Sequence, residues 1–227
     1  LVLISLPAAS SYSARWVDVM TGASLVALVA LALMERNESL VVQLAAESRT
    51  DALTGLLNRR GFDERAALAQ AHTRRAGGSL ALVTFDLDYF KRVNDEWGHE
   101  MGDRVLARTG AVIGELVRET DVAARVGGEE FTVLLPLTDA HEAEAFTQRV
   151  RRALAATDPD GTPLVRVSAG VSVCASPAAI ETCLQRADSA LYQAKRSGRD
   201  RTVTFDEGAP DIERTPAAAA ELAHDHA

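Results

Sequence analysis

Apolar positions along the chain switch between helical and strand spacing from residue 51 to residue 205. A period of three to four residues predicts helices, and short continuous or alternating apolar runs predict strands. In chain order we expect a helix over residues 62–78, a strand over 79–88, a helix over 102–120, strands over 121–126 and 130–136, a helix over 139–156, a strand over 165–175, a helix over 179–198 and an edge strand over 202–205. The pattern predicts an α/β (α+β) domain in which one central, mainly antiparallel sheet is flanked by helices.

The N-terminal part has a different pattern. Residues 16–34, WVDVMTGASLVALVALALM, carry one charge, and as a helix they would span about 28 Å, close to the hydrocarbon thickness of a bilayer. A signal peptide fits less well, because only Arg15 precedes the stretch and no small-residue cleavage site follows Met34. A buried helix would need a polar face, which the stretch lacks. We therefore expect residues 1–34 to be the end of a truncated membrane region with a transmembrane helix.

Polar segments flank the predicted domain on both sides. Residues 35–50 predict a connecting helix, and their pattern fits a short parallel signalling stalk and a solvated linker helix equally well. Residues 206–227 mix proline, alanine and charge without a periodic apolar face, which predicts a disordered tail. The domain itself is expected over residues 51–205.

Composition excludes one class of function. The net charge of −8 and the pI near 5.2 argue against a protein that holds nucleic acid on a broad basic surface. Any phosphate ligand must therefore be held by a few local cations. The two cysteines, Cys174 and Cys183, have no metal-binding spacing, and we expect them to be reduced, buried thiols.

Carboxylates occur where two predicted strands end or begin. Asp86 and Asp88 close the apolar run SLALVTF, and Glu129 and Glu130 follow the Gly127-Gly128 pair that is expected to turn a two-residue hairpin by accepting positive φ. If the two strands are neighbours, Asp86 and Glu129 can reach one divalent ion, because hard cations prefer carboxylate oxygens. The alternative is that these groups are solvated charges at strand ends. Four of them beside a small turn favour a metal and nucleotide site.

Four segments in order resemble the signatures of the GGDEF domain, the diguanylate cyclase family: DALTGLLNRRGF, FDLDYFKRVNDEWGHEMGD, ARVGGEEF and ADSALYQAKRSGRD. The resemblance covers residues 50–205. It implies a palm-like α/β fold, related to that of nucleotide cyclases and polymerases. It also implies condensation of two GTP molecules into cyclic di-GMP with release of pyrophosphate. The GGEEF variant belongs to the active forms of this family.

The resemblance also assigns roles to individual residues. It implies a metal site formed by the carboxylates of Asp86 and Glu129 and the carbonyl of Leu87, with Glu129 and Glu130 as catalytic residues. The metal would be Mg²⁺, and Mn²⁺ is an alternative. An amide and a carboxylate, Asn94 and Asp103, would read the guanine edge and so select GTP. The cations implied to contact phosphates are Lys91, Lys195 and Arg199.

The reaction and one further motif imply partners. Because the product is two-fold symmetric, two domains must face each other, which implies a homodimer. The segment RETD matches the family's inhibitory RxxD site, with Arg118 and Asp121 in the motif and Arg149 as the supporting arginine. Cyclic di-GMP would then be both product and inhibitor. The structural alternative is an arginine at a helix C-terminus followed by a capping aspartate.

Two functions stay open at this point. One is a membrane-anchored diguanylate cyclase in the inner (cytoplasmic) membrane of a bacterium, with its catalytic domain in the cytoplasm. The other is a catalytically silent receptor that binds GTP or cyclic di-GMP. A cyclase with relaxed base choice is a further alternative, and Asp103 favours guanine.

Overall fold

The computed structural model describes residues 48–156, 161–175 and 180–206, together with Met20, Leu28, Leu31, Leu33, Met34 and Arg36. The chain divides into two units, Leu1–Ser48 and Arg49–Ala227. All the helices and strands named below belong to the second unit.

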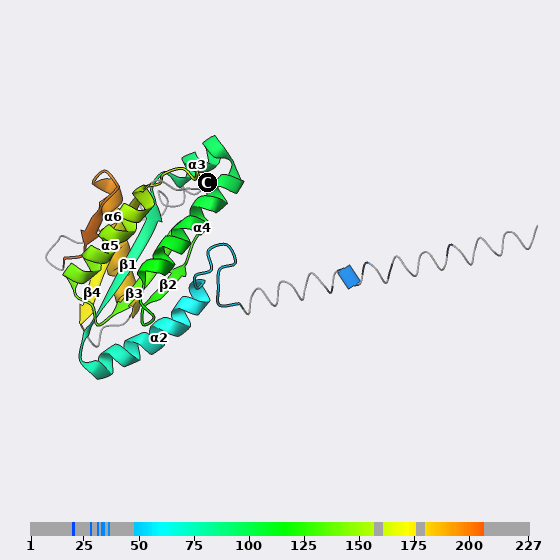
Figure 1. The fold of residues 1–227 in the computed structure, drawn as a ribbon. Coiled ribbons are helices and arrows are strands. Elements are labelled where there is room, and N and C mark those ends of the chain that lie inside the picture. Colours follow the sequence, from blue (N-terminus) through cyan, green and yellow to red (C-terminus); the bar gives the residue numbers. More distant parts are fainter. Residues whose placement is uncertain are drawn as a thin grey trace, which may run out of the picture. The chain divides into compact units, whose positions relative to one another are not determined.

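Within the described residues, one five-stranded sheet has the order β2-β3-β1-β4-β5 (Figure 1). The central strand β1 (Ser79–Leu87) pairs antiparallel with β3 (Glu130–Pro136) on one side and with β4 (Val167–Ala175) on the other. At the edges, β2 (Val122–Arg125) is antiparallel to β3, and β5 (Thr202–Thr204) is parallel to β4. The predicted mainly antiparallel sheet and its closing edge strand are confirmed.

Helices cover both faces of the sheet and give the domain three layers. One face packs against α2 (Arg59–Ala76) and α6 (Ile180–Arg196), and the other against α3 (Phe90–Trp97), α4 (His99–Leu116) and α5 (Ala140–Ala155). The alternation of side chains along a strand sends Leu80 and Leu82 of β1 into the first core and Val83 and Phe85 into the second. All four are at most 5% exposed.

Local sequence signals set where these helices begin and end. The side chain of Asn58 accepts a hydrogen bond from the backbone N–H of Gly61 at the start of α2 (2.9 Å), and Asp139 and Glu142 form a capping box at the start of α5. The sequence did not predict α3. It has only eight residues, of which Phe90 alone is buried, so its apolar period is too short to recognise.

The structure corrects one expectation about the cysteines. Cys174 of β4 and Cys183 of α6 form a disulfide and are not reduced thiols. Both are buried, as expected, at 4% and 1% exposure. Their nine-residue separation gave no sign of pairing, because only the packing of α6 across β4 brings them together.

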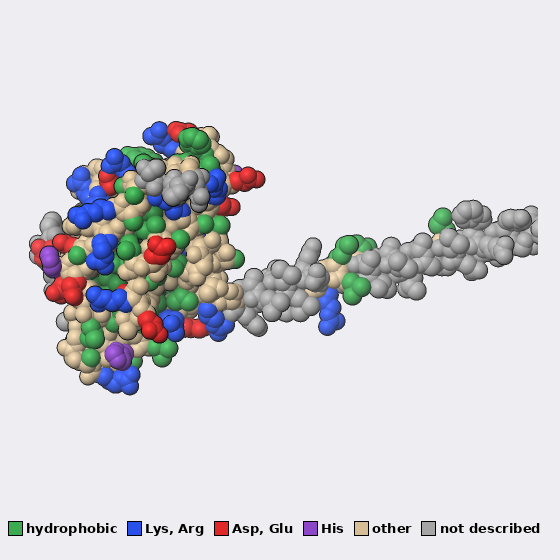
Figure 2. Space-filling model, in the orientation of Figure 1, with side chains coloured by type: hydrophobic (Ala, Val, Ile, Leu, Met, Phe, Trp, Pro, Cys, Tyr) green, Lys and Arg blue, Asp and Glu red, His purple; other side chains and the backbone are tan. Residues whose placement is uncertain are grey.

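Some predictions fall on residues whose structure is not described. The predicted transmembrane helix and connecting helix lie almost wholly outside the described residues, and so does the tail beyond residue 206. Among the residues that are described, no helix has the length and apolar content needed to cross a bilayer. On the face of the molecule seen in Figure 2, Lys and Arg side chains are interspersed with Asp and Glu.

Candidate active site

The acidic end of β1 lies beside the beginning of β3, as the sequence predicted for neighbouring strands. Asp86 pairs in register with Glu130, and the backbone N–H of Leu87 donates to the carbonyl of Glu129 (3.4 Å). Residues directly opposite in a ladder present their side chains on the same face. The side chain directly opposite Asp86 on this face therefore belongs to Glu130, and Glu129, which was predicted to share a metal with Asp86, lies one residue earlier in the turn.

Asp86 is a buried carboxylate next to a buried cation. It is 2% exposed, and its Oδ2 atom lies 2.8 Å from Nζ of Lys195 on α6. This contact is an ion pair without hydrogen-bond alignment, since Oδ2 has no well-aligned donor among the described residues. Burial raises the pKa of Asp86, the Lys195 charge opposes that shift, and the neighbouring Glu130 and Asp88 carboxylates reinforce it.

The turn between β2 and β3 differs from the expected two-residue hairpin. The backbone N–H of Val126 donates to the carbonyl of Glu130 (3.0 Å), so Gly127, Gly128 and Glu129 form the loop. Neither glycine has positive φ, so the prediction that the two glycines accept positive φ in the turn is wrong. A Cβ on Gly127 would lie 2.5 Å from Oε2 of Glu130, whereas one on Gly128 would meet nothing within 4 Å. Gly127 therefore makes room for the Glu130 carboxylate.

Arg125 ties this turn to the segment that begins the domain. Its guanidinium donates twice to the Gly128 carbonyl (2.7 and 3.1 Å) and contacts both carboxylate oxygens of Asp51 (3.2 and 3.3 Å). Burial acts to raise the pKa of Asp51, but hydrogen bonds from Thr54 and the Arg125 charge outweigh it and hold that pKa below its ordinary value. The motifs DALTG and RVGGEEF are thus joined by one arginine.

A pocket of about 610 Å³ opens beside the turn, within the usual size range of small-molecule sites. Five of the predicted site residues line it: Lys91, Asn94, Asp103, Glu129 and Glu130. Residues 86, 87, 195 and 199, also predicted, are not among its lining residues. The structure therefore separates a pocket lined by these five residues from the Asp86–Lys195 pair at the end of β1.

The pair that is predicted to read guanine comes from two consecutive helices. Asn94 lies on α3 and Asp103 on α4, and Gly98 joins the helices with φ 82°. Sequence reasoning missed Gly102, where a Cβ would lie 1.9 Å from Oδ1 of Asn94. The signal was present, because a glycine inside a predicted helix usually has a packing or functional reason.

The fourth acidic residue has a structural role. Asp88 is 7% exposed; its Oδ1 accepts from the Ser168 hydroxyl (2.7 Å) and its Oδ2 from the backbone N–H of Asp200 (2.9 Å). Nearby, the guanidinium of Arg199 lies 4.7 Å from the ring centroid of Tyr89. The segment after α6 is therefore held against the end of β1.

The oxygen donors at the end of β1 fit a hard divalent cation. A buried carboxylate oxygen without an aligned donor, at Asp86, is the kind of group that such an ion satisfies. No cluster of three or more His, Cys, Asp and Glu side chains suited to a metal occurs in the described part of the chain. The predicted set does not require one, because it consists of two carboxylates and a backbone carbonyl.

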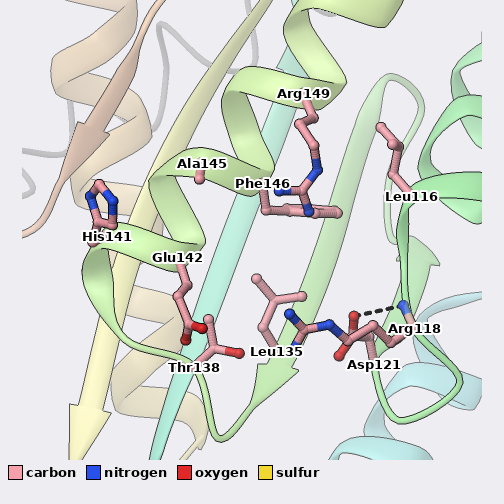
Figure 3. A pocket seen from close by; sticks show the side chains of 10 residues that line it. All are labelled: Leu116, Arg118, Asp121, Leu135, Thr138, His141, Glu142, Ala145, Phe146 and Arg149. Carbon is pink, nitrogen blue, oxygen red and sulfur yellow. Dashed lines mark hydrogen bonds between the residues drawn. The ribbon is translucent and has the colours of Figure 1, made fainter.

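A second pocket, of about 220 Å³, contains all three residues of the predicted inhibitory site (Figure 3). Arg149 on α5 stacks on Phe146, with 5.7 Å from its Cζ atom to the ring centroid. The backbone N–H of Arg118 donates to Oδ2 of Asp121 (2.8 Å), the local contact expected from the structural alternative. Burial raises the pKa of Asp121. The side chains of the motif still line the pocket, so the local contact and a binding role are compatible.

Comparisons with known proteins identify the family to which this domain is similar. Residues 48–201 match the family described as "Diguanylate cyclase, GGDEF domain". The chain is 42% identical over 183 residues to the diguanylate cyclase DgcP of Pseudomonas aeruginosa, which covers 75% of this chain and 27% of that protein. It is 38% identical over 180 residues to the cyclic di-GMP phosphodiesterase NbdA of the same organism, covering 77% of this chain and 23% of that protein.

Solved structures show the same fold. The crystal structure of the GGDEF domain of DgcB from Caulobacter crescentus in complex with c-di-GMP superposes with a TM-score of 0.65 at 32% identity, covering 70% of this chain and 96% of that chain. The present chain spans about a quarter of the length of the two curated relatives. The match over most of the domain and the placement of the motif residues show that the chain belongs to the GGDEF domain family of diguanylate cyclases.

Proposed function

We propose that this domain is an active diguanylate cyclase that condenses two GTP molecules into cyclic di-GMP and two pyrophosphates. The observation that carries the proposal is the 610 Å³ pocket, in which Asn94, Asp103 and both glutamates of the GGEEF turn line one space. A receptor without turnover would need the guanine pair but would have no use for the second acidic pair. The buried Asp86 and Lys195 beside the pocket favour turnover.

Guanine selection follows from the polarity of the pair. The Asp103 carboxylate can accept from guanine N1–H and N2–H, and the Asn94 amide can donate to N3. Adenine offers a different set of donors and acceptors at this edge, so it would leave the carboxylate unpaired. Asp103 is exposed in the free domain, so the cost arises when a bound base covers it. Leaving a polar group unpaired once binding buries it costs about 1 to 3 kcal/mol, which favours GTP over ATP.

The 3′-oxygen of each GTP attacks the α-phosphorus of the other. As each new phosphorus–oxygen bond forms, the bond from that phosphorus to the oxygen bridging to the β-phosphate breaks, and pyrophosphate leaves with the electron pair. Glu129 or Glu130 accepts the proton of the attacking hydroxyl. Lys91, Lys195 and Arg199 neutralise the triphosphate. Two domains must contribute one GTP each, so the active form is a homodimer.

A bound Mg²⁺, or Mn²⁺ in its place, supplies charge neutralisation at the phosphate oxygens. Asp86, the Leu87 carbonyl and one of the two glutamates are the residues that would hold it. The register favours Glu130 for this role, because it lies directly opposite Asp86 on the same face of the sheet. Glu129, in the turn, is then better placed to act on the hydroxyl.

We also propose that cyclic di-GMP inhibits the enzyme by binding at Arg118, Asp121 and Arg149. Two guanidinium groups and a carboxylate around one pocket suit a phosphate together with a guanine edge. Because 220 Å³ is small for a whole ligand, this pocket would take one part of the product. In Arg118→Ala, progress curves should lose their early plateau and cyclic di-GMP binding should weaken.

Anchoring in the inner (cytoplasmic) membrane of a bacterium, with the catalytic domain in the cytoplasm, is proposed on the apolar pattern of residues 16–34 alone. Recovery of the full chain in the soluble fraction, without detergent, would contradict it.

The decisive experiment is product analysis of the full chain incubated with GTP and Mg²⁺, beside Glu129→Gln and Glu130→Gln. Cyclic di-GMP from the parent, and at least about a hundredfold less from the variants, would support the proposal. A folded, dimeric parent that binds GTP but makes no product would favour the receptor function instead.

A further inference from the structure

Backbone strain gathers where the end of β1 meets the segment after α6. Within the described chain, four residues other than glycine have positive φ, and three of them lie here: Tyr89 (58°), Arg199 (57°) and Asp200 (46°). A side chain at positive φ is unfavourable, and such residues persist only where the surrounding contacts hold them. The two strained segments hold each other, since the Asp200 N–H donates to Asp88 (2.9 Å).

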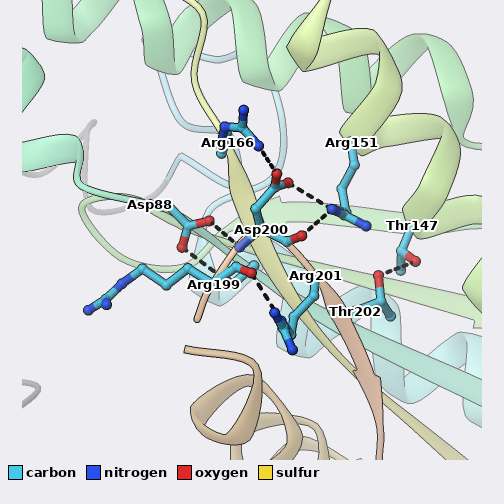
Figure 4. Close-up of polar contacts among 9 residues, drawn as sticks. Asp88, Thr147, Arg151, Arg166, Arg199, Asp200, Arg201 and Thr202 are labelled. Carbon is cyan, nitrogen blue, oxygen red and sulfur yellow. Dashed lines mark hydrogen bonds and ion pairs between the residues drawn. The ribbon is translucent and has the colours of Figure 1, made fainter. Parts of the chain in front are cut away.

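Asp200 is the centre of a charged cluster that fixes this backbone (Figure 4). Its carboxylate forms ion pairs with Arg151 of α5 (2.7 Å) and with Arg166, and Arg151 also donates to its carbonyl. Burial acts to raise the pKa of Asp200, but hydrogen bonds from the two arginines outweigh it and keep that pKa below its ordinary value. Three elements of the fold, the end of β1, α5 and the segment before β4, thus converge on one residue.

Arg199 projects from this anchored backbone in a different direction from Asp200 (Figure 4). Its guanidinium lies over the ring of Tyr89, with 4.7 Å from Cζ to the ring centroid, and Nη1 is 3.4 Å from the Tyr89 hydroxyl. Tyr89 is 57% exposed, so the ring is not there to fill the core. A strained, exposed aromatic residue with a cation on its face calls for a role outside folding.

A second cation, Lys195, lies at the same end of the sheet. It comes from the last turn of α6 and reaches Asp86, two residues before Asp88 on β1. The end of α6 and the segment after it therefore bring two cations to the same end of the sheet, one on a carboxylate and one on an aromatic ring. The Lys195 cation contacts a buried carboxylate, whereas the Arg199 guanidinium contacts an exposed ring.

We propose that Tyr89 is a positioning residue for Arg199: its ring, held by the strained turn after β1, keeps the guanidinium in one orientation toward the triphosphate of GTP. The inference rests on the proposed function, because it takes Arg199 to be a phosphate contact. A long cation held in one rotamer loses less freedom on binding, so the benefit appears as affinity for phosphate. Tyr89 itself touches Arg199 and need not touch the substrate.

The test compares GTP with guanosine, which shares the base and ribose but has no phosphate. Binding of each to the full chain is measured by calorimetry in EDTA, which prevents turnover, for the parent, Tyr89→Leu and Tyr89→Phe. Both Tyr89 variants are repeated in an Arg199→Ala background. Thermal unfolding of every variant shows whether the strained turn still folds, and Phe keeps the ring as the matched control.

We expect Tyr89→Leu to weaken GTP binding about threefold, the effect of an exposed cation–π contact, and to leave guanosine binding unchanged. Tyr89→Phe should bind GTP like the parent, and Tyr89→Leu should have no further effect once Arg199 is alanine. Equal loss for GTP and guanosine, unchanged GTP affinity in Tyr89→Leu, or an undiminished effect in the Arg199→Ala background would overturn the inference while leaving the cyclase intact. If the parent protein binds GTP and guanosine with equal affinity, the phosphates contribute nothing to binding. The assignment of GTP as the substrate would then be wrong, and so would the inference that rests on it.

Discussion

Three glycines on helix α4 provide a graded test of how this fold shapes its pocket. At Gly102 an added Cβ would lie 1.9 Å from Oδ1 of Asn94, against the 3.0 Å below which such contacts are essentially never seen. The amide oxygen would have to move by about 1 Å, a displacement large enough to disrupt a bound base. Gly102→Ala is therefore expected to act on guanine binding through Asn94.

The size of the effect follows from the hydrogen bonds at stake. If the displaced amide no longer meets guanine, about 1 to 3 kcal/mol of binding is lost, which corresponds to an increase in KM for GTP of about 5- to 140-fold. Stability should change little. The new methyl group gains up to about 1 kcal/mol of helix propensity, and the crowding against Phe90, at 3.2 Å, offsets that gain.

The other two glycines are the controls. At Gly114 a Cβ would make an ordinary 3.7 Å contact with Leu56, so Gly114→Ala should raise stability by up to about 1 kcal/mol without changing KM. At Gly110 it would lie 2.9 Å from the backbone carbonyl oxygen of Thr54, so Gly110→Ala should cost about 1 to 3 kcal/mol.

Initial-rate kinetics with GTP and urea unfolding of all three variants measure both quantities. A Gly102→Ala variant with the KM of the parent, or a Gly114→Ala variant whose KM rises by as much as that of Gly102→Ala, would contradict an effect through Asn94.

Three further substitutions test other contacts. Arg125→Ala removes the partner of Asp51 at a site where both side chains are mostly buried. It should lower the free energy of unfolding by about 2 kcal/mol in urea titrations. A change under about 0.5 kcal/mol, typical of surface substitutions, would show that the Arg125–Asp51 contact does not stabilise the packing of the DALTG segment against RVGGEEF. Asp200→Asn should destabilise the domain most at neutral pH. The folded-state pKa of Asp200 lies below its ordinary value of 3.8. The contribution of the ionised carboxylate to the free energy of unfolding is therefore complete above pH 3.8 and is lost as the pH falls through the folded-state pKa. Unfolding measured from pH 7 down to about pH 3 should show the parent and variant converging, and a constant difference would argue against a role for the charge. Arg108→Ala removes the donor to three carbonyls at the end of α5 and should cost about 1 to 3 kcal/mol; Arg108→Lys, which cannot span all three, should recover only part of it, and an Ala variant as stable as the parent would show that water replaces these bonds.

The local pattern of the sequence was enough for most of the architecture. Within the part of the chain that the structure describes, long apolar runs and helical periods identified every strand of the sheet and all the helices from α2 to α6 except α3. They did so because burial of one face repeats along the chain at the spacing of the element. The motif residues were also identifiable, since Asn94, Asp103, Glu129 and Glu130 stand in ordered segments that resemble one family, and the structure brings these four to one pocket.

Other features required the three-dimensional arrangement. That Glu130 faces Asp86 depends on the register of β1 against β3, and a one-residue difference in register would have reversed the assignment. The glycines of the turn make space and do not supply positive φ, which only the backbone geometry reveals.

Long-range packing decided the rest. Asp88 binds Asp200, 112 residues later, and Cys174 meets Cys183 only because α6 crosses β4. Likewise, Arg125 reaches Asp51, 74 residues earlier. The elements and the chemical groups of this domain can be predicted from the sequence, because both are encoded over short spans. Which groups pair is visible only in the folded domain, because pairing depends on register and crossing helices, to which residues far apart in the sequence contribute together.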